Sequence, residues 1–303
     1  MKFTRYQFEI MAFVEKEKQL EHNQRFISDT LCISGNQIKK DIEFLTEKGL
    51  LAEKNGFICV TDAGLDALEP YRVKNAVILA AGFGNRMMPA TADRPKPMVK
   101  VNGQRIIDTL LDALVKVGIK DISIVRGYKK ERFDELLEKY PFVTLIDNDE
   151  YDKTNNISSA MLLLDKLNGC YLCEADLYIS NPDVITKYQY CSNILGSYSL
   201  ETDDWSFKMK DGFITEYQKG NTYCWNYYGI SYWTPEDCEK LKRDFTKCYY
   251  ELEGGRDYFW EFIPLVLFKD DYNVEIRQCK KQDIIEIDNY YELAILDSSY
   301  ILD

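Results

Sequence analysis

A stretch of glycine, proline and basic residues, residues 75–101, carries the densest set of side chains suited to chemistry in this chain. An apolar run of strand length ends at Gly82, and Gly84, Arg86 and Lys96 follow in the loop after it. Glycine lets backbone N–H groups approach an anion closely, while arginine offers a planar fork of donors and lysine a compact charge. The stretch therefore predicts a phosphate-binding loop at the end of a buried strand.

Two common glycine motifs do not describe this loop. The letters G-F-G-N-R-M lack the third glycine of the dinucleotide fingerprint, and no G-K-S or G-K-T follows to make a Walker loop. The longer string from L-A-A-G-F-G-N-R to P-K-P-M-V is more specific than either. It resembles the nucleotide-binding loop of the sugar-nucleotidyltransferase superfamily.

Acidic residues end two later apolar runs. Glu174 and Asp176 follow the run that begins at Cys170, and Asp288 ends the run that begins at Asp283. Residues two apart on a strand share a face, so Glu174 and Asp176 can reach one cleft. Carboxylates from separate strand ends, with phosphate oxygens and water, form a shell suited to Mg²⁺. We predict Asp176 and Asp288 as metal ligands; the alternative for Asp288 is a helix cap.

The residue composition excludes several mechanisms. A single histidine, His22, cannot build a Ser-His-Asp triad, a Cys-His dyad or a His-rich metal site within one chain. Catalysis must then use lysine, arginine and carboxylates, which are typical of metal-assisted phosphoryl or nucleotidyl transfer. The formal net charge of −12 argues against broad nucleic-acid affinity but allows a local basic pocket.

The same composition indicates the compartment. Nine cysteines without a repeated spacing suit a reducing environment, and Cys170 and Cys173 lie three apart on a strand, facing opposite sides. The chain has no apolar stretch long enough to cross a membrane, and its charged, aromatic beginning is unlike a secretion signal. We expect a cytoplasmic protein that does not enter the membrane.

Strand and helix patterns alternate through residues 75–303, which we assign to one domain. Strands are expected at 76–81, 121–125 and 143–146, with helices at 106–117 and 129–140. This βαβ spacing predicts an α/β fold with a doubly wound, mostly parallel sheet and right-handed crossovers. Ligands in such sheets bind at the carboxyl ends of the strands, where the Gly82 loop falls.

Residues 1–72 predict a separate small domain of helices and a hairpin, joined by a linker over residues 69–74. Three helical patterns precede an Asn55-Gly56 turn between two short apolar runs, and a last short helix ends near Leu68. This order resembles a winged helix-turn-helix domain, whose third helix would enter a DNA major groove. However, residues 1–72 contain ten Lys/Arg and twelve Asp/Glu, and that helix carries acidic residues beside its lysines. We therefore favour a docking or dimerising module, with a homodimer as one outcome, over DNA binding.

Further motifs narrow the resemblance. V-R-G-Y, Y-D-K-T-N-N-I-S-S, E-A-D, D-D-W-S-F, Y-Y-G-I-S-Y-W, D-Y-F-W and I-E-I-D occur in this order after the loop. Together they resemble the bacterial CTP:phosphocholine cytidylyltransferases over nearly everything from Asn75 onward. The usual family residue at Glu174 is aspartate, which leaves the role of Glu174 open. The resemblance implies Mg²⁺ on Asp176 and Asp288, catalytic roles for Lys96 and Arg86 on the triphosphate, and a nucleotide site of Leu79, Ala81, Gly82, Gly84, Arg86, Lys96, Asn156 and Ser159.

Aromatic residues are abundant in the second half of the chain. A quaternary ammonium donates no hydrogen bond, so ring faces and a nearby carboxylate recognise it, at about 0.5–2 kcal/mol per cation–π contact. The resemblance implies that Trp205 and Phe259 line a choline site, with Tyr258 and Trp260 as further candidates. The alternative for each ring is ordinary core packing.

The resemblance implies attack of phosphocholine on the α-phosphorus of CTP, which yields CDP-choline and pyrophosphate. The attacking phosphate is already an anion near neutral pH, so the reaction requires no general base. Alternative acceptors are 2-aminoethylphosphonate or phosphoethanolamine, whose primary ammonium prefers carboxylates, and a sugar 1-phosphate with another nucleotide. A different class of function is a DNA-binding regulator with a nucleotide-sensing domain. The base preference and the oligomeric state stay open at this point.

Overall fold

The computed structural model describes residues 2–17 and 22–301 and divides into two compact units. One unit is Met1–Arg72 together with Tyr188–Tyr190, and the other is Val73–Lys187 together with Cys191–Asp303. Tyr188–Tyr190 joins the first unit although it lies far along the chain. No local pattern in the sequence predicts that these three residues belong to the N-terminal unit.

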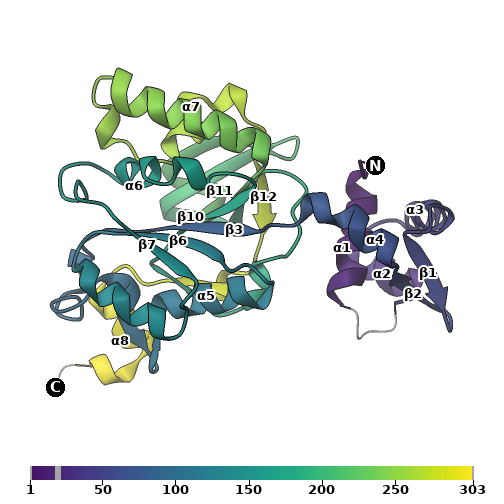
Figure 1. Ribbon diagram of the computed structural model, residues 1–303, viewed down its shortest axis with the longest axis horizontal. Coiled ribbons are helices and arrows are strands. Elements are labelled where there is room, and N and C mark those ends of the chain that lie inside the picture. The colour runs from purple at the N-terminus through teal and green to yellow at the C-terminus, as the bar shows by residue number, and fades with distance from the viewer. Residues whose placement is uncertain (1, 18–21, 302–303) are drawn as a thin grey trace. The chain divides into compact units, whose positions relative to one another are not determined.

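The N-terminal unit is helical with one hairpin (Figure 1). Asn55 and Gly56 both have positive φ, 54° and 82°, as a tight hairpin turn requires. Its likeness to a DNA-binding domain remains a prediction. Apolar residues from all its helices form one core, which includes Ile10, Met11, Ile27, Ile38, Leu45, Leu51 and Leu68. Its elements are α1 (Arg5–Lys16), α2 (Gln24–Leu31), α3 (Gly35–Glu47), β1 (Leu51–Lys54), β2 (Phe57–Val60) and α4 (Asp62–Leu68).

The larger unit is built on a seven-stranded sheet in the order β10-β12-β11-β8-β3-β6-β7. The inner strand β3 pairs in parallel with both β6 and β8, β6 pairs in parallel with β7, and β11 pairs antiparallel to β8. The predicted α/β class with a mostly parallel central sheet is therefore confirmed. The strands are β3 (Asn75–Ala80), β6 (Asp121–Arg126), β7 (Val143–Asp147), β8 (Cys170–Glu174), β10 (Asn193–Lys210), β11 (Phe213–Trp233) and β12 (Glu275–Gln278).

Helices cover both faces of this sheet (Figure 1). Ala76 and Ile78 of β3 pack into the apolar cluster that contains α5, whereas Val77 and Leu79 pack into the cluster that contains α6 and α7. Burial on both faces explains the unbroken apolar run of β3. The remaining elements are β4 (Lys100–Val101), β5 (Gln104–Arg105), α5 (Ile106–Lys116), α6 (Ile157–Met161), β9 (Leu177–Ile179), α7 (Pro235–Glu251), β13 (Ile284–Glu286) and α8 (Tyr290–Leu296).

One predicted helix differs in type. The segment expected as an α-helix over 129–140 is a 3₁₀-helix, Lys130–Glu138. It starts from Lys129 in the left-handed region, at φ 47°, and no side chain caps it. Among the described residues, no helix combines the length and the apolar character needed to cross a membrane.

Candidate functional site

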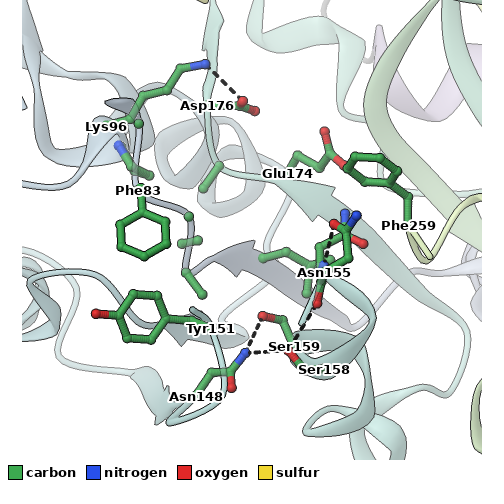
Figure 2. A pocket seen from close by; sticks show the side chains of 18 of the residues that line it. Phe83, Lys96, Asn148, Tyr151, Asn155, Ser158, Ser159, Glu174, Asp176 and Phe259 are labelled. Atoms are coloured by element: carbon green, nitrogen blue, oxygen red, sulfur yellow. Dashed lines mark hydrogen bonds and ion pairs between the residues drawn. The ribbon is translucent and has the colours of Figure 1, made fainter. Parts of the chain in front are cut away.

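A cavity of about 480 Å³ lies at the carboxyl ends of β3 and β8 (Figure 2). The Gly82 loop, the segment after β7, the end of β8, one aromatic residue and one late carboxylate contribute its walls. The location agrees with the rule for ligands in open α/β sheets. Of the residues singled out from the sequence, those that line it are Leu79, Ala81, Gly82, Gly84, Arg86, Lys96, Asn156, Ser159, Asp176, Phe259 and Asp288, with Glu174 beside them.

Lys96 is the centre of the charged end. It is 7% exposed, and its Nζ donates to Asp176 Oδ2 at 3.0 Å and to Asp288 Oδ1 at 3.2 Å. Arg86 Nη1 lies 2.9 Å from Asp288 Oδ2. Burial alone would lower the pKa of Lys96, but the two carboxylates outweigh it and the pKa is raised. The structure thus joins a basic loop and two distant acidic side chains in one cavity.

Gly84 fixes the path of the loop beside Lys96. It has a positive φ of 63°, and a Cβ added there would lie 2.9 Å from Lys96 Cβ and 3.3 Å from Thr91 Cγ2. Thr91 Oγ1 donates to the Gly84 carbonyl at 3.0 Å. Only glycine therefore fits this position, both for its backbone angle and for the close approach of the lysine.

Three carboxylates meet at the charged end. Oxygen atoms of Asp176, Glu286 and Asp288 lie within 4.8 Å of one another, and Asp176 Oδ1 is buried without a hydrogen-bond partner among the described residues. Burial, with Asp176 and Asp288 nearby, raises the pKa of Glu286 to about 8. Oxygen donors of this kind suit Mg²⁺. Asn289, not Asp288, caps α8, because its side chain accepts the N–H of Glu292.

Glu286 is a site residue that was not predicted from the sequence. The signal was present, because Glu286 and Asp288 lie two apart in I-I-E-I-D and such residues share a strand face. Only the pairing of β13 with β9 brings that face to the end of β8.

Aromatic rings form a second wall of the cavity. Phe259 lines it and contacts Trp205 edge to face at 6.1 Å, and Trp205 stacks on Tyr217 at 4.8 Å. Behind this wall, Glu261 is 3% exposed; its Oε1 accepts from the Tyr217 hydroxyl at 3.3 Å, and its Oε2 has no partner among the described residues. Burial raises the pKa of Glu261 to about 7. Burial, then Glu261 and Asp176, raise the pKa of Glu174 well above its ordinary value.

Three of the four expected acceptor residues, Trp205, Tyr258 and Trp260, do not line the cavity. Trp260 is fully buried in the core, with its ring 6.1 Å from Trp233 and 6.3 Å from Phe245, which corrects the expectation for that residue. Tyr258 stacks on Phe262 at 5.4 Å instead. Successive side chains in this irregular segment point in different directions, so D-Y-F-W presents only its phenylalanine to the cavity. Trp205 borders the cavity through Phe259.

The other end of the cavity carries rings and small polar groups. Phe83 is 38% exposed, and its ring lies 5.2 Å from that of Tyr151. A Cβ on Gly127 would come within 2.6 Å of Tyr151, so glycine there lets the tyrosine lie close to the loop. Asn148, at the end of β7, contacts two serines of the same wall. These residues were not predicted as site residues, although Asn148 follows a strand end at the ligand-binding edge.

Asn155 and Asn156 join the polar wall of the cavity to the segment that carries Phe259. Asn155 N donates to the Arg256 carbonyl at 2.9 Å, and its Nδ2 donates to the Asp257 carbonyl at 3.0 Å. Asn156 Oδ1 accepts the backbone N–H of Trp260 at 2.8 Å. These bonds hold the segment that carries Phe259 against the polar wall.

Comparison with known proteins gives consistent matches. The profile of the family described as nucleotidyl transferase matches residues 75–192. A 2-aminoethylphosphonate cytidylyltransferase of Lancefieldella rimae is 38% identical over 231 residues, covering 75% of this chain and 93% of the relative. A choline-phosphate cytidylyltransferase of Haemophilus influenzae is 31% identical over 219 residues, covering 71% and 92%.

Solved structures agree with the sequence matches. The CTP:phosphocholine cytidylyltransferase of Streptococcus pneumoniae superposes with a TM-score of 0.69 at 30% identity, covering 76% of this chain and 100% of that one. The inositol-1-phosphate CTP transferase of T. maritima superposes with a TM-score of 0.59 at 15% identity, covering 73% and 91%, and shows the shared fold alone.

Proposed function

This chain belongs to the nucleotidyltransferase family, as a cytidylyltransferase acting on a phospho-compound, and we propose that its acceptor is 2-aminoethylphosphonate. The observation that carries this proposal is a pair of carboxylates beside the aromatic wall: Glu174 lines the cavity, and Glu261 lies behind the wall against Tyr217. A primary ammonium donates three hydrogen bonds and is neutralised by carboxylates. A bound ammonium would also offset the cost of burying these acidic groups.

Phosphocholine is the second candidate. The ring of Phe259, backed by Trp205, offers the aromatic faces that a quaternary ammonium prefers. The same rings pack equally well against the methylene groups of a smaller amine. The carboxylate pair therefore favours the primary amine, and the aromatic wall alone does not exclude the quaternary one.

The proposed reaction is an in-line displacement. An oxygen of the phosphonate attacks the α-phosphorus of CTP, the bond from that phosphorus to the bridging oxygen breaks, and pyrophosphate leaves. The attacking oxygen is already anionic, so no side chain has to remove a proton. The task of the site is to cancel repulsion between two anions. We assign that task to Lys96 and Arg86, whose charges lie at one end of the cavity.

We also propose that Asp176 and Asp288 hold Mg²⁺, with Glu286 beside them. The carboxylate oxygens fit a hard divalent cation, and the unpartnered Asp176 Oδ1 is an available donor. When bound, Mg²⁺ supplies charge neutralisation to the phosphate oxygens. Lys96 bridges the two aspartates and offsets the repulsion between their charges.

Pyrophosphate release across a matrix of nucleotides and acceptors tests this proposal. The nucleotides are CTP, UTP, ATP and GTP, and the acceptors are 2-aminoethylphosphonate, phosphoethanolamine, phosphocholine and glucose 1-phosphate. We expect the highest kcat/KM for CTP with 2-aminoethylphosphonate. A higher value with phosphocholine would assign the second candidate, and release with glucose 1-phosphate alone would contradict both.

A further inference from the structure

The backbone determines how the Asn148 amide is turned. Its Oδ1 accepts the N–H of Glu150 at 2.9 Å, and a backbone N–H can only donate. The amide nitrogen must therefore face the other way, where it lies 2.9 Å from Ser158 Oγ and 3.0 Å from Ser159 Oγ. Asn148 is 3% exposed, so water does not compete for these bonds.

This orientation leaves the two serines in different states. Each accepts one hydrogen from Asn148, and Ser158 donates its own hydrogen to the Asn155 carbonyl at 3.1 Å. The hydroxyl hydrogen of Ser159 has no acceptor among the described residues. Ser159 is 2% exposed and lines the cavity. A buried hydrogen of this kind is costly until a ligand offers it a lone pair.

Ser159 lies at the end of the cavity suited to a base. Phe83 and Tyr151 provide ring surfaces on that side, while Lys96 and Asp176 lie on the other (Figure 2). The charged end suits phosphates, so the planar group of a nucleotide belongs with the rings and the serine.

We propose that Asn148 sets the base preference of this site by presenting the Ser159 hydroxyl as a donor to N3 of cytosine. This inference rests on the proposed function, since it assumes that the cavity binds a pyrimidine nucleotide. N3 of cytosine carries a lone pair, which satisfies the Ser159 hydrogen. N3 of uracil carries a hydrogen, which leaves the Ser159 hydrogen unpaired. Asn148 is thus a positioning residue that acts through Ser159.

The variant Asn148→Asp tests this polarity with little change in shape. One carboxylate oxygen keeps the bond to the Glu150 N–H, while the other replaces the amide nitrogen and accepts the Ser159 hydrogen. Ser159 then offers a lone pair to the base and accepts N3–H of uracil. We expect the ratio of the Kd for UTP to the Kd for CTP to fall from roughly 100-fold or more to below about 10-fold. Calorimetry of the full chain with Mg²⁺ and without acceptor measures both constants.

The ratio separates this effect from general damage. The added negative charge weakens both nucleotides alike and therefore cancels in the ratio. Ser159→Ala should reduce the ratio to a similar extent. Ser158→Ala is the matched control, because its hydrogen is already used inside the protein, and it should leave the ratio unchanged.

Each outcome decides the inference. CTP binding with an unchanged ratio in Asn148→Asp overturns it and leaves the proposed function intact. If circular dichroism shows that Asn148→Asp does not fold, the test is the comparison of Ser159→Ala with Ser158→Ala. Equal ratios in these two variants overturn the inference. Absence of nucleotide binding by the unaltered chain overturns both the inference and the proposed function.

Discussion

Lys96 is the residue on which the charged end depends. Its Nζ contacts two carboxylates that follow different strands, Asp176 after β8 and Asp288 after β13, and its burial protects the charge from screening by solvent. A charge placed before the substrate arrives stabilises developing negative charge without rearrangement.

Lys96→Ala should lower kcat by about 10²–10³-fold, since it removes one preorganised charge from the site. Steady-state pyrophosphate release gives this value, and circular dichroism checks that the fold persists. Lys100→Ala, at an exposed position of the same segment, is the control and should behave as the unaltered chain. Full turnover in Lys96→Ala would remove the lysine from the mechanism.

Glu261 should make acceptor binding depend on pH. Its pKa is raised to about 7 by burial, so the carboxylate loses its charge as the pH falls below that value. We expect the KM for 2-aminoethylphosphonate to rise about tenfold from pH 8 to pH 6, while the KM for CTP changes little. The phosphonate group also titrates in this range. The Glu261→Gln variant keeps the titration of the phosphonate and lacks that of Glu261, so the difference between the two pH profiles gives the contribution of Glu261. An identical pH profile in that variant would exclude Glu261 from the acceptor site.

The same residue should affect stability in the absence of substrate. The pKa of Glu261 in the folded protein lies above the ordinary value of 4.5, so the folded state favours the neutral carboxyl group. The folded protein therefore loses stability as the pH rises through 7 and Glu261 becomes charged. Glu261→Gln should therefore raise the unfolding free energy at pH 8 by about 1–3 kcal/mol and have a smaller effect at pH 5. Urea denaturation at both pH values measures the difference. Equal effects at the two values would contradict the assigned cause.

At the scale of elements, the backbone of the loop between β3 and β4 is fixed by hydrogen bonds and prolines within the loop itself. The Gly84 carbonyl accepts from Thr91, and Lys96 starts a short 3₁₀ turn between two prolines. Proline restricts the backbone on both sides of the lysine, which reduces the entropy lost when the substrate binds.

Gly84→Ala and Gly82→Ala should separate two roles of glycine in this loop, close packing within the protein and close approach of the backbone to CTP. A Cβ at Gly84 meets Lys96 and Thr91 at a positive φ, so we expect a loss of about 1–2 kcal/mol of stability together with reduced turnover. A Cβ at Gly82 meets nothing within 4 Å, so Gly82→Ala should keep the stability of the unaltered chain and lower only the affinity for CTP. Thermal denaturation and calorimetry with CTP provide the two readouts. A stable, fully active Gly84→Ala variant would refute the packing argument.

At the scale of the whole molecule, the role of the N-terminal unit is a separate question. Its acidic and basic residues nearly balance, and Asp41 of α3 is used internally, where it accepts from Gln7 and Gln37. The bond from Gln7 joins α1 to α3, and the bond from Gln37 lies within α3. We propose a docking or dimerising role for this unit.

DNA retardation tests that proposal against the alternative. We expect no specific complex at either 50 mM or 200 mM salt, because a phosphate-tracking surface needs a clear excess of positive charge. A random duplex is the control for nonspecific retention. A salt-resistant, sequence-dependent complex would reassign the unit to DNA binding, and light scattering of the full chain would show whether it forms a dimer.

The amino-acid sequence alone determined the features that depend on local chemistry. The alternation of strands and helices predicted the α/β class, and the carboxylates at strand ends were predicted because alternation assigns residues to a face. The glycine and lysine of the loop were recognisable because only such residues suit close contact with an anion.

Tertiary structure decided everything that depends on which faces meet. It added Glu286 through the pairing of β13 with β9, placed Glu261 behind Tyr217, turned Asn148 toward two serines and put Trp260 in the core. Sequence periodicity specifies the direction of a side chain from its own strand or helix. It carries no information on the partner that lies opposite, because that partner is chosen by packing between segments far apart in the chain.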